Sequence, residues 1–242
     1  MTEAAALAAI AFLGALIFGV TGFGAALVTI PLATHFVPLK FALALFVLAD
    51  LAAALSVGLE NPKNAVRGEW TRLVPMILAG TALGVTLLVN LPRAAGMLLL
   101  GLFVVWFGLF SLLRRPGGTI ISSRWAWPAG FAGGITSTLF GAGGPPYAIY
   151  LSQRGLTKEQ FRATLGLATL TSISLRLIAF ALTGLLLDMH IWLTALAVVP
   201  ACLLGIWVAR KIFRRISREA LMRAVALLLL ASGATLIWRA VA

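Results

Sequence analysis

The chain has 242 residues, of which 61% are hydrophobic and 11% are charged, and its mean hydropathy is +1.04. Soluble domains carry roughly 25% charged residues. This composition therefore excludes an ordinary soluble protein and predicts an all-α, polytopic integral membrane protein. The net charge is +12, but no basic stretch is interleaved with aromatic residues on a soluble module, so we expect no nucleic-acid partner.

The first predicted membrane segment, residues 4–35, consists of an apolar arm, a glycine-rich interruption and a shorter apolar arm. The interruption reads Thr21, Gly22, Phe23, Gly24. No basic region or obvious cleavage site precedes it, so we expect a membrane segment and not a removable signal peptide. Apolar runs long enough to cross a membrane, which takes ~20 residues, follow at 41–59, 73–89 and 94–113.

The second half of the chain repeats this order. Residues 125–153 are interrupted at 140–146, FGAGGPP, and predicted spans follow at 161–187, 191–208 and 220–238. Three glycines and two prolines in seven residues cannot continue a helix, because glycine loosens the backbone and an interior proline removes a donor. In lipid such a break is tolerated only where protein or a water-filled cavity surrounds it.

The basic residues indicate how the two interrupted segments cross the membrane. Of the 19 Lys and Arg residues, 14 fall in four segments, 60–72, 114–124, 154–162 and 209–218. Short loops rich in Lys and Arg lie in the cytoplasm. All four segments can do so only if 4–35 and 125–153 each return to the side from which they enter. We therefore predict that each interrupted segment is a broken helical hairpin.

Each half then contains one broken hairpin and three spans, an odd number of crossings, so the halves have opposite orientations. We predict an N-terminal repeat at 1–113, a cytoplasmic linker at 114–124 and a C-terminal repeat at 125–242. Inverted repeats underlie alternating access in many secondary transporters, and paired broken segments indicate the binding site. Internal similarity supports the repeat weakly, because the tripeptide FGA at 23–25 recurs at 140–142 and chance could produce it.

The glycine breaks have the chemistry of an anion site. Where the break at 141–144 ends one half-helix, Pro145 and Pro146 can begin the next, since proline is favoured in the first turn. A helix start presents unpaired N–H groups and a partial positive charge, and glycines let an anion approach closely. A hinge, or close helix packing without a ligand, is the alternative interpretation. The predicted substrate-binding residues are Thr21, Gly22, Phe23, Gly24, Gly141, Ala142, Gly143, Gly144, Pro145 and Arg176.

Two ionisable residues lie deep inside predicted spans, where a charge is costly and indicates function. Arg176 follows the polar residues Thr169, Thr171, Ser172 and Ser174, and its fork of donors suits an oxyanion. It could instead pair with a carboxylate, or reach the outer surface. Asp50 is predicted as the ion-coupling residue, carrying a proton, and pairing with Arg176 is the alternative. A protonated Asp50 would favour anion binding because it removes a repulsive charge.

Three stretches resemble the TauE/SafE family of sulfite and organosulfonate exporters. They are TGFGAALVTIPL, GGITSTLFGAGGPPYAIYL and LTKEQFRAT, and the two-half layout and total length also fit. The first stretch departs from the family at Ala25 and Ala26, where glycines often continue. The resemblance implies export of sulfite or an organosulfonate across the bacterial inner membrane.

Other functional classes find little support in the sequence. Neither an HExxH motif nor a pair of intramembrane aspartates is present, so we expect no enzyme, metal or cofactor. Active export would need an ion gradient, of protons or sodium, or a partner, since the chain has no ATPase motif. A passive anion channel, or a transporter of a different small organic anion, is the alternative function. We expect the basic run 210–215 to contact anionic lipid headgroups, and a homodimer stays open.

Overall fold

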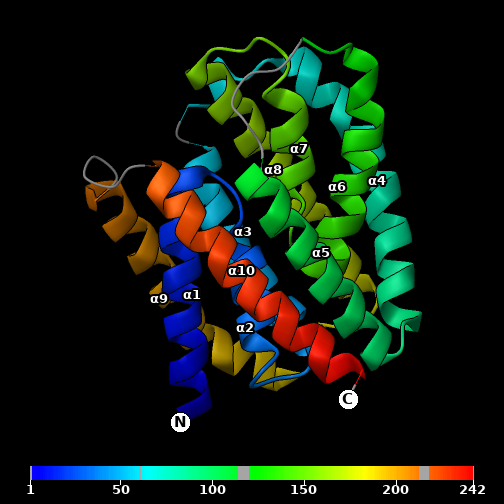
Figure 1. Ribbon diagram of the computed structural model, residues 1–242, viewed down its shortest axis with the longest axis vertical. Coiled ribbons are helices and arrows are strands. Elements are labelled where there is room, and N and C mark those ends of the chain that lie inside the picture. The colour runs from blue at the N-terminus through cyan, green and yellow to red at the C-terminus, as the bar shows by residue number, and fades with distance from the viewer. Residues whose placement is uncertain (1, 60, 114–119, 213–217, 242) are drawn as a thin grey trace.

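The computed structural model describes residues 2–59, 61–113, 120–212 and 218–241, and every regular element among them is a helix (Figure 1). The all-α prediction is therefore confirmed. The first half contains α1 (Thr2–Thr21), α2 (Ala25–Ala33), α3 (Leu39–Gly58), the short turn η1 (Pro62–Asn64), α4 (Arg67–Asn90) and α5 (Arg93–Leu113). The second half contains η2 (Ser123–Trp125), α6 (Ala126–Phe140), α7 (Gly144–Leu151), α8 (Lys158–Leu182), α9 (Met189–Ile212) and α10 (Arg218–Val241).

Six of the described helices are long and apolar enough to cross a membrane: α1, α3, α4, α5, α8 and α9. Five of them overlap predicted spans, and α1 is the long arm of the first hairpin. For the predicted span 220–238, the described residues of α10 contain only the shorter apolar stretch Leu229–Trp238. The predicted span 161–187 is wrong at its end. There α8 stops at Leu182, because Gly184 turns the backbone with a φ of 77°. The apolar residues that follow Gly184 belong to the connection to α9, and hydropathy alone does not distinguish them from the helix.

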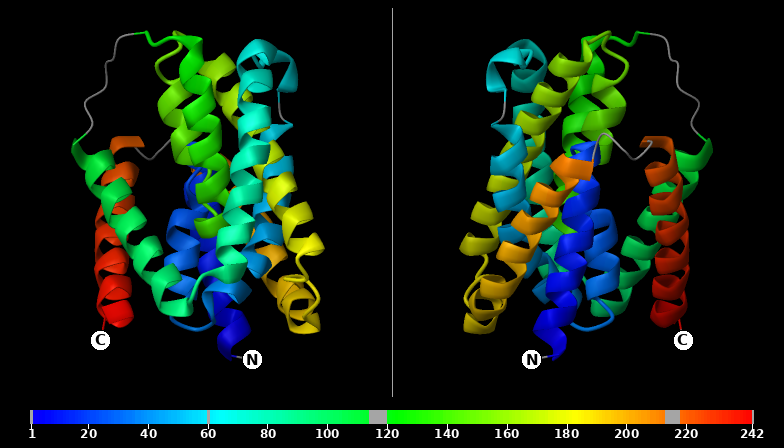
Figure 2. Two further views of the ribbon diagram at one scale, coloured as in Figure 1. Left: turned by 90° about the vertical axis from the view of Figure 1, so that its right-hand side faces the viewer. Right: turned by 90° about the vertical axis from the view of Figure 1, so that its left-hand side faces the viewer.

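Both interrupted segments fold back on themselves, α1 against α2 and α6 against α7. Gly24 precedes α2 with a φ of 91°, and Gly141 ends α6 with a φ of 73°. L-residues rarely adopt this left-handed conformation, so glycine is required at both turns. As expected from the sequence, α7 has a proline in its first turn. Figure 2 shows α2 in the lower half of the molecule and α7 in the upper half, so the hairpins enter from opposite ends.

The described parts of the four basic segments lie toward one end of the molecule. The starts of α4, α6 and α8 are at the upper end in Figures 1 and 2, and α9 ends in the upper half. The connections α2–α3, α4–α5 and α8–α9 are at the lower end. The excess of Lys and Arg predicts that the upper end faces the cytoplasm, and we refer to it below as the cytoplasmic end. Most of the linker, 114–119, and residues 213–215 of the basic run lie outside the described residues.

Glycines bring the helix backbones close together in the pairs that organise the bundle. A Cβ added to Gly80 of α4 would lie 2.2 Å from the Phe131 carbonyl oxygen of α6, and one on Gly205 of α9 would lie 2.6 Å from the Phe12 carbonyl of α1. Small residues permit such contact where lipid supplies no hydrophobic driving force. The long arm of each hairpin therefore packs against a span of the other half, α6 on α4 and α1 on α9.

Exchanging the two halves leaves most of this packing pattern unchanged. In this exchange α1 to α5 of the first half correspond, in order, to α6 to α10 of the second. The contact of α1 with α9 then becomes that of α6 with α4, and the contact of α3 with α9 becomes that of α8 with α4. The contacts α3–α8 and α5–α10 are unchanged. Related halves would produce such a pattern, and the inverted repeat itself stays a prediction. The arrangement places α3 and α8 against each other in the centre, next to both hairpins.

Candidate substrate-binding site

The tips of the two hairpins meet near the middle of the molecule. A Cβ added to Gly144 would lie 2.5 Å from the Cβ of Phe23. Between the tips is a cavity of about 20 Å³, counted as space open to the centre of a water molecule, which is room for about one water. It is bordered by Phe23, Gly24, Ala25 and Ala26 of the first hairpin and by Gly141, Ala142, Gly143 and Gly144 of the second. The two glycine breaks, far apart in the sequence, therefore face one small space.

The starts of α2 and α7 both border this cavity. The first amides of a helix have no partner within the helix, and they carry part of its positive dipole. At α2 these amides belong to residues from Gly24 onward, whereas at α7 the prolines Pro145 and Pro146 lack an N–H. Pro145 therefore supplies no donor and does not border the cavity. The donors at the second tip are the amides of Gly143 and Gly144.

Asp50 of α3 and Arg176 of α8 form an ion pair beside the tips. The Nη2 of Arg176 lies 2.6 Å from Oδ2 of Asp50, and its Nη1 donates to the carbonyl oxygen of Ser137 at 2.9 Å. The Arg176 side chain is fully buried, and Asp50 borders the cavity. The structure thus shows the pairing that the sequence left open. A buried pair adds little net stability, so its presence at membrane depth indicates function more than folding.

Unpaired donors are buried around the same space. The hydroxyl of Thr169, on α8, borders the cavity and has no hydrogen-bond partner, and Nε of Arg176 is also without one. A buried polar group left unsatisfied costs roughly 1–3 kcal/mol. The Thr169 hydroxyl is therefore available to an acceptor in the cavity, whereas Arg176 lies behind Asp50 and Gly141 and does not itself border the space. An oxyanion would satisfy such donors, whereas an apolar ligand would not.

Two polar residues that border the cavity, Tyr147 and Ser137, were missed from the sequence. Tyr147 of α7 donates its hydroxyl to Oγ of Ser172 at 3.0 Å, and both border the cavity together with Ser137. Ser172 belongs to the polar face of α8 that the sequence indicated. Tyr147 directly follows the two prolines, and Ser137 lies one helical turn before Gly141. These positions relative to the break could have identified both.

Two predicted site residues of the first tip, Gly22 and Thr21, are not among the described residues that border the central cavity. Gly22 borders a second, larger cavity near the cytoplasmic end. Thr21 ends α1, but its side chain lies outside the described residues. In the part of the chain that the structure describes, no group of three or more His, Cys, Asp or Glu residues is placed to hold a metal ion.

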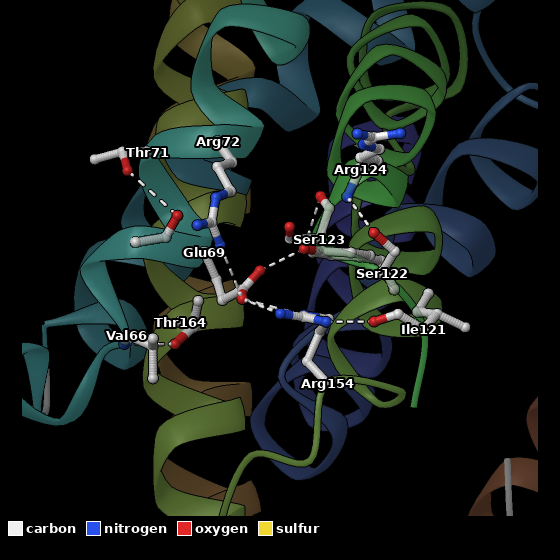
Figure 3. A network of polar contacts seen from close by, with 12 residues as sticks. Val66, Glu69, Thr71, Arg72, Ile121, Ser122, Ser123, Arg124, Arg154 and Thr164 are labelled. Carbon is white, nitrogen blue, oxygen red and sulfur yellow. Dashed lines mark hydrogen bonds and ion pairs between the residues drawn. The ribbon is translucent and has the colours of Figure 1, made fainter. Parts of the chain in front are cut away.

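A polar network fixes the cytoplasmic end of the second hairpin (Figure 3). Glu69, buried in the first turn of α4, accepts hydrogen bonds from Nη2 of Arg154 at 2.8 Å, from Arg72 at 3.3 Å and from the Tyr150 hydroxyl. Arg154 also donates to the carbonyl oxygen of Ile121. The hydrogen bond to Glu69 raises the pKa of Arg154, so Arg154 stays charged. Sequence reasoning missed Glu69, because its partners Arg154 and Tyr150 lie more than 80 residues away.

Comparison with known proteins agrees with this architecture. The family model of the sulfite exporter TauE/SafE matches residues 7–236. The chain is also similar to the probable inner membrane transporter protein TsaS of Comamonas testosteroni, with 25% identity over 199 residues, 81% of this chain and 83% of the relative. No solved structure matches the chain. Since the family match covers almost its entire length, this polytopic membrane transporter belongs to the sulfite exporter TauE/SafE family.

Proposed function

We propose that this transporter exports a small sulfur-containing oxyanion, sulfite or an organosulfonate, by alternating access across the bacterial inner membrane. The observation that carries the proposal is the convergence of two half-helix starts and an unpartnered hydroxyl on one central cavity, whose wall includes Asp50, the ion-pair partner of the buried Arg176. The family description supports the choice of anion. The name of the relative supports transport and the inner membrane.

The donors around the cavity suit an oxyanion. Amides at the starts of α2 and α7 and the Thr169 hydroxyl border the space, and they can donate to two or three oxygens of one sulfonate. The Arg176 guanidinium stays charged and donates through a planar fork. The cavity holds about one water and no sulfonate. Substrate binding therefore requires the tips to move apart, as alternating access provides.

Asp50 couples the anion to a proton in this proposal. While it is ionised, Asp50 occupies the Arg176 guanidinium and repels a second anion. Protonation removes that charge and releases Arg176, so an anion and a proton bind together. A monoanion and its proton cross the membrane without net charge. The direction of flux then follows the combined gradients of anion and proton.

Binding and counterflow of candidate anions test the proposal. We expect sulfite or a short-chain sulfonate to raise the melting temperature of the purified protein in a saturable manner, whereas chloride and acetate at equal ionic strength do not. In proteoliposomes whose membrane potential is clamped, unlabelled anion inside should accelerate uptake of labelled anion, which a passive channel does not produce under that condition. Selective binding of a carboxylate would indicate the alternative substrate class. Flux without saturation or counterflow would indicate a channel.

Replacing Asp50 with asparagine should remove the pH dependence of transport. Asparagine matches the protonated carboxyl in shape and charge, so we expect Asp50→Asn to bind the anion more tightly than the unmodified protein at alkaline pH and equally well at acidic pH. A sulfonate is the suitable substrate, because its own charge does not change with pH in this range. Initial rates are measured in proteoliposomes over a pH series. An unchanged pH profile in Asp50→Asn would exclude proton coupling through this residue.

A further inference from the structure

A second cavity, separate from the central one, lies near the cytoplasmic end of the molecule. It measures about 390 Å³, many times the volume of the central cavity. Its walls come from the end of α1, the end of α3, the end of α7 and the start of α8. We call it the vestibule. Among the described residues that line the vestibule is Gly22 of the first hairpin tip. The vestibule therefore lies directly beside the candidate site.

The charged side chains that border the vestibule are both cationic. Among the described residues that line it, these are Lys158 and Arg162, and none is acidic. Apolar side chains, including Leu151, Phe161 and Leu165, form most of the remaining wall. Charges of one sign in a cleft with low-dielectric walls raise the local concentration of counter-ions. The vestibule therefore has the charge and the size to collect small anions from the cytoplasm.

The placement of these cations is unfavourable for α8 itself. Lys158 and Arg162 are four residues apart in the first turns of the helix. Like charges at this spacing repel, and cations at a helix start oppose its dipole. The same end of the helix is stabilised by a capping box between Thr157 and Gln160. The capping box and the acidic Glu159 of the same turn offset this cost, so the two cations are tolerated at this helix start without contributing to its stability.

The vestibule and the central cavity have one described lining residue in common. Phe18, near the end of α1, borders both spaces and is itself buried. The backbone beyond it is open, since a Cβ on Gly22 would meet nothing within 4 Å. A movement of the first hairpin tip, which carries both residues, would join the two cavities. Phe18 is thus placed as the inner barrier of a path from the cytoplasm to Arg176.

We propose that the vestibule is a cytoplasmic recruiting site for small oxyanions, in which Lys158 and Arg162 bind the anion before it passes Phe18. This inference rests on the proposed function, because it assigns the cytoplasmic end of the same transport path. The phosphate of a lipid headgroup has similar chemistry to a free oxyanion. The experiment therefore has to distinguish a soluble anion from a lipid.

Thiol modification measures the electrostatics of the vestibule without any substrate. The chain has one cysteine, Cys202, which is buried, so Cys202→Ala provides a cysteine-free background. Ser152→Cys then places a thiol on the vestibule wall. In inside-out vesicles we expect an anionic thiosulfonate reagent to react on the order of tenfold faster than a cationic reagent of similar size. Lys158→Gln with Arg162→Gln should remove this preference.

The matched control is Lys63→Gln, which removes an exposed cation from the same end of the molecule but outside the vestibule. It should leave the preference for the anionic reagent intact. An equal loss with Lys63→Gln, or no loss with the vestibule pair, would overturn the inference. A preference present in phosphatidylcholine vesicles but lost when phosphatidylglycerol is added would also overturn it, since a lipid headgroup would then occupy the site.

Transport measurements separate this inference from the proposed function. If the oxyanion is transported, the variant with both vestibule substitutions should show a several-fold higher KM with little change in maximal rate, whereas Lys63→Gln should not. If no sulfur oxyanion is transported while the reagent preference depends on Lys158 and Arg162, the proposed substrate is wrong and the vestibule assignment stands. If transport is normal and the KM is unchanged, the recruiting role is wrong.

Discussion

Replacing Arg176 with glutamine is expected to lower transport of the oxyanion by roughly a hundredfold or more. Arg176 is the buried cation beside both hairpin tips, and its guanidinium reaches Asp50 at 2.6 Å and the Ser137 carbonyl at 2.9 Å. Removing one partner of a buried, hydrogen-bonded charge pair at a binding site costs about 2–5 kcal/mol. Initial rates in proteoliposomes measure the loss, and ligand-induced shifts in melting temperature show whether binding is lost with it.

A double substitution separates binding from folding. Arg176→Gln alone leaves the Asp50 carboxylate buried without its countercharge, which destabilises a protein by about 3–5 kcal/mol. Asp50→Asn in the same chain removes that charge, so the double variant should regain most of the stability lost by Arg176→Gln. It should still fail to transport, because the cation that binds the anion is absent. Normal transport by the stable double variant would show that the pair is structural.

The overall architecture could be predicted because lipid leaves few alternatives. The glycine breaks and the basic segments together required two hairpins, and the structure folds both segments back as expected. Helix ends could not be predicted to the residue. Hydropathy extends the span of α8 through Leu187, but the helix ends at Leu182 because Gly184 adopts a positive φ. Such turns depend on local backbone conformation, which an average over apolar residues does not contain.

The candidate site was predictable where a buried charged residue has few energetically acceptable arrangements. Two charges deep in lipid are best paired, so Asp50 with Arg176 was among the expected arrangements, and the structure contains that pair. Tyr147 and Glu69 were not predictable in the same way. Tyr147 lies within an apolar run, and Glu69 looks like a loop residue until Arg154 and Tyr150 are placed beside it. Their roles depend on tertiary contacts that no local pattern encodes.

Replacing Gly144 with alanine is expected to reduce transport at least tenfold while leaving α7 helical. The added Cβ would lie 2.5 Å from the Cβ of Phe23 in the opposite hairpin, so one tip must shift. Overpacking of this kind costs typically about 1–3 kcal/mol. Alanine is otherwise the better helix former, by up to ~1 kcal/mol, so a loss cannot come from the helix itself. Counterflow in proteoliposomes and thermal unfolding in detergent measure the two effects.

Gly68→Ala is the matched control for this substitution, because Gly68 also lies in the first turn of a helix, α4, and its added Cβ would meet nothing within 4 Å. It should transport at the normal rate and be as stable as the unmodified protein or slightly more stable. The comparison isolates the contact between the tips from the general effect of an added methyl group. If Gly144→Ala transports as well as Gly68→Ala, the close approach of the hairpin tips is not required. The alternating-access proposal would then need a different closing contact between the hairpin tips.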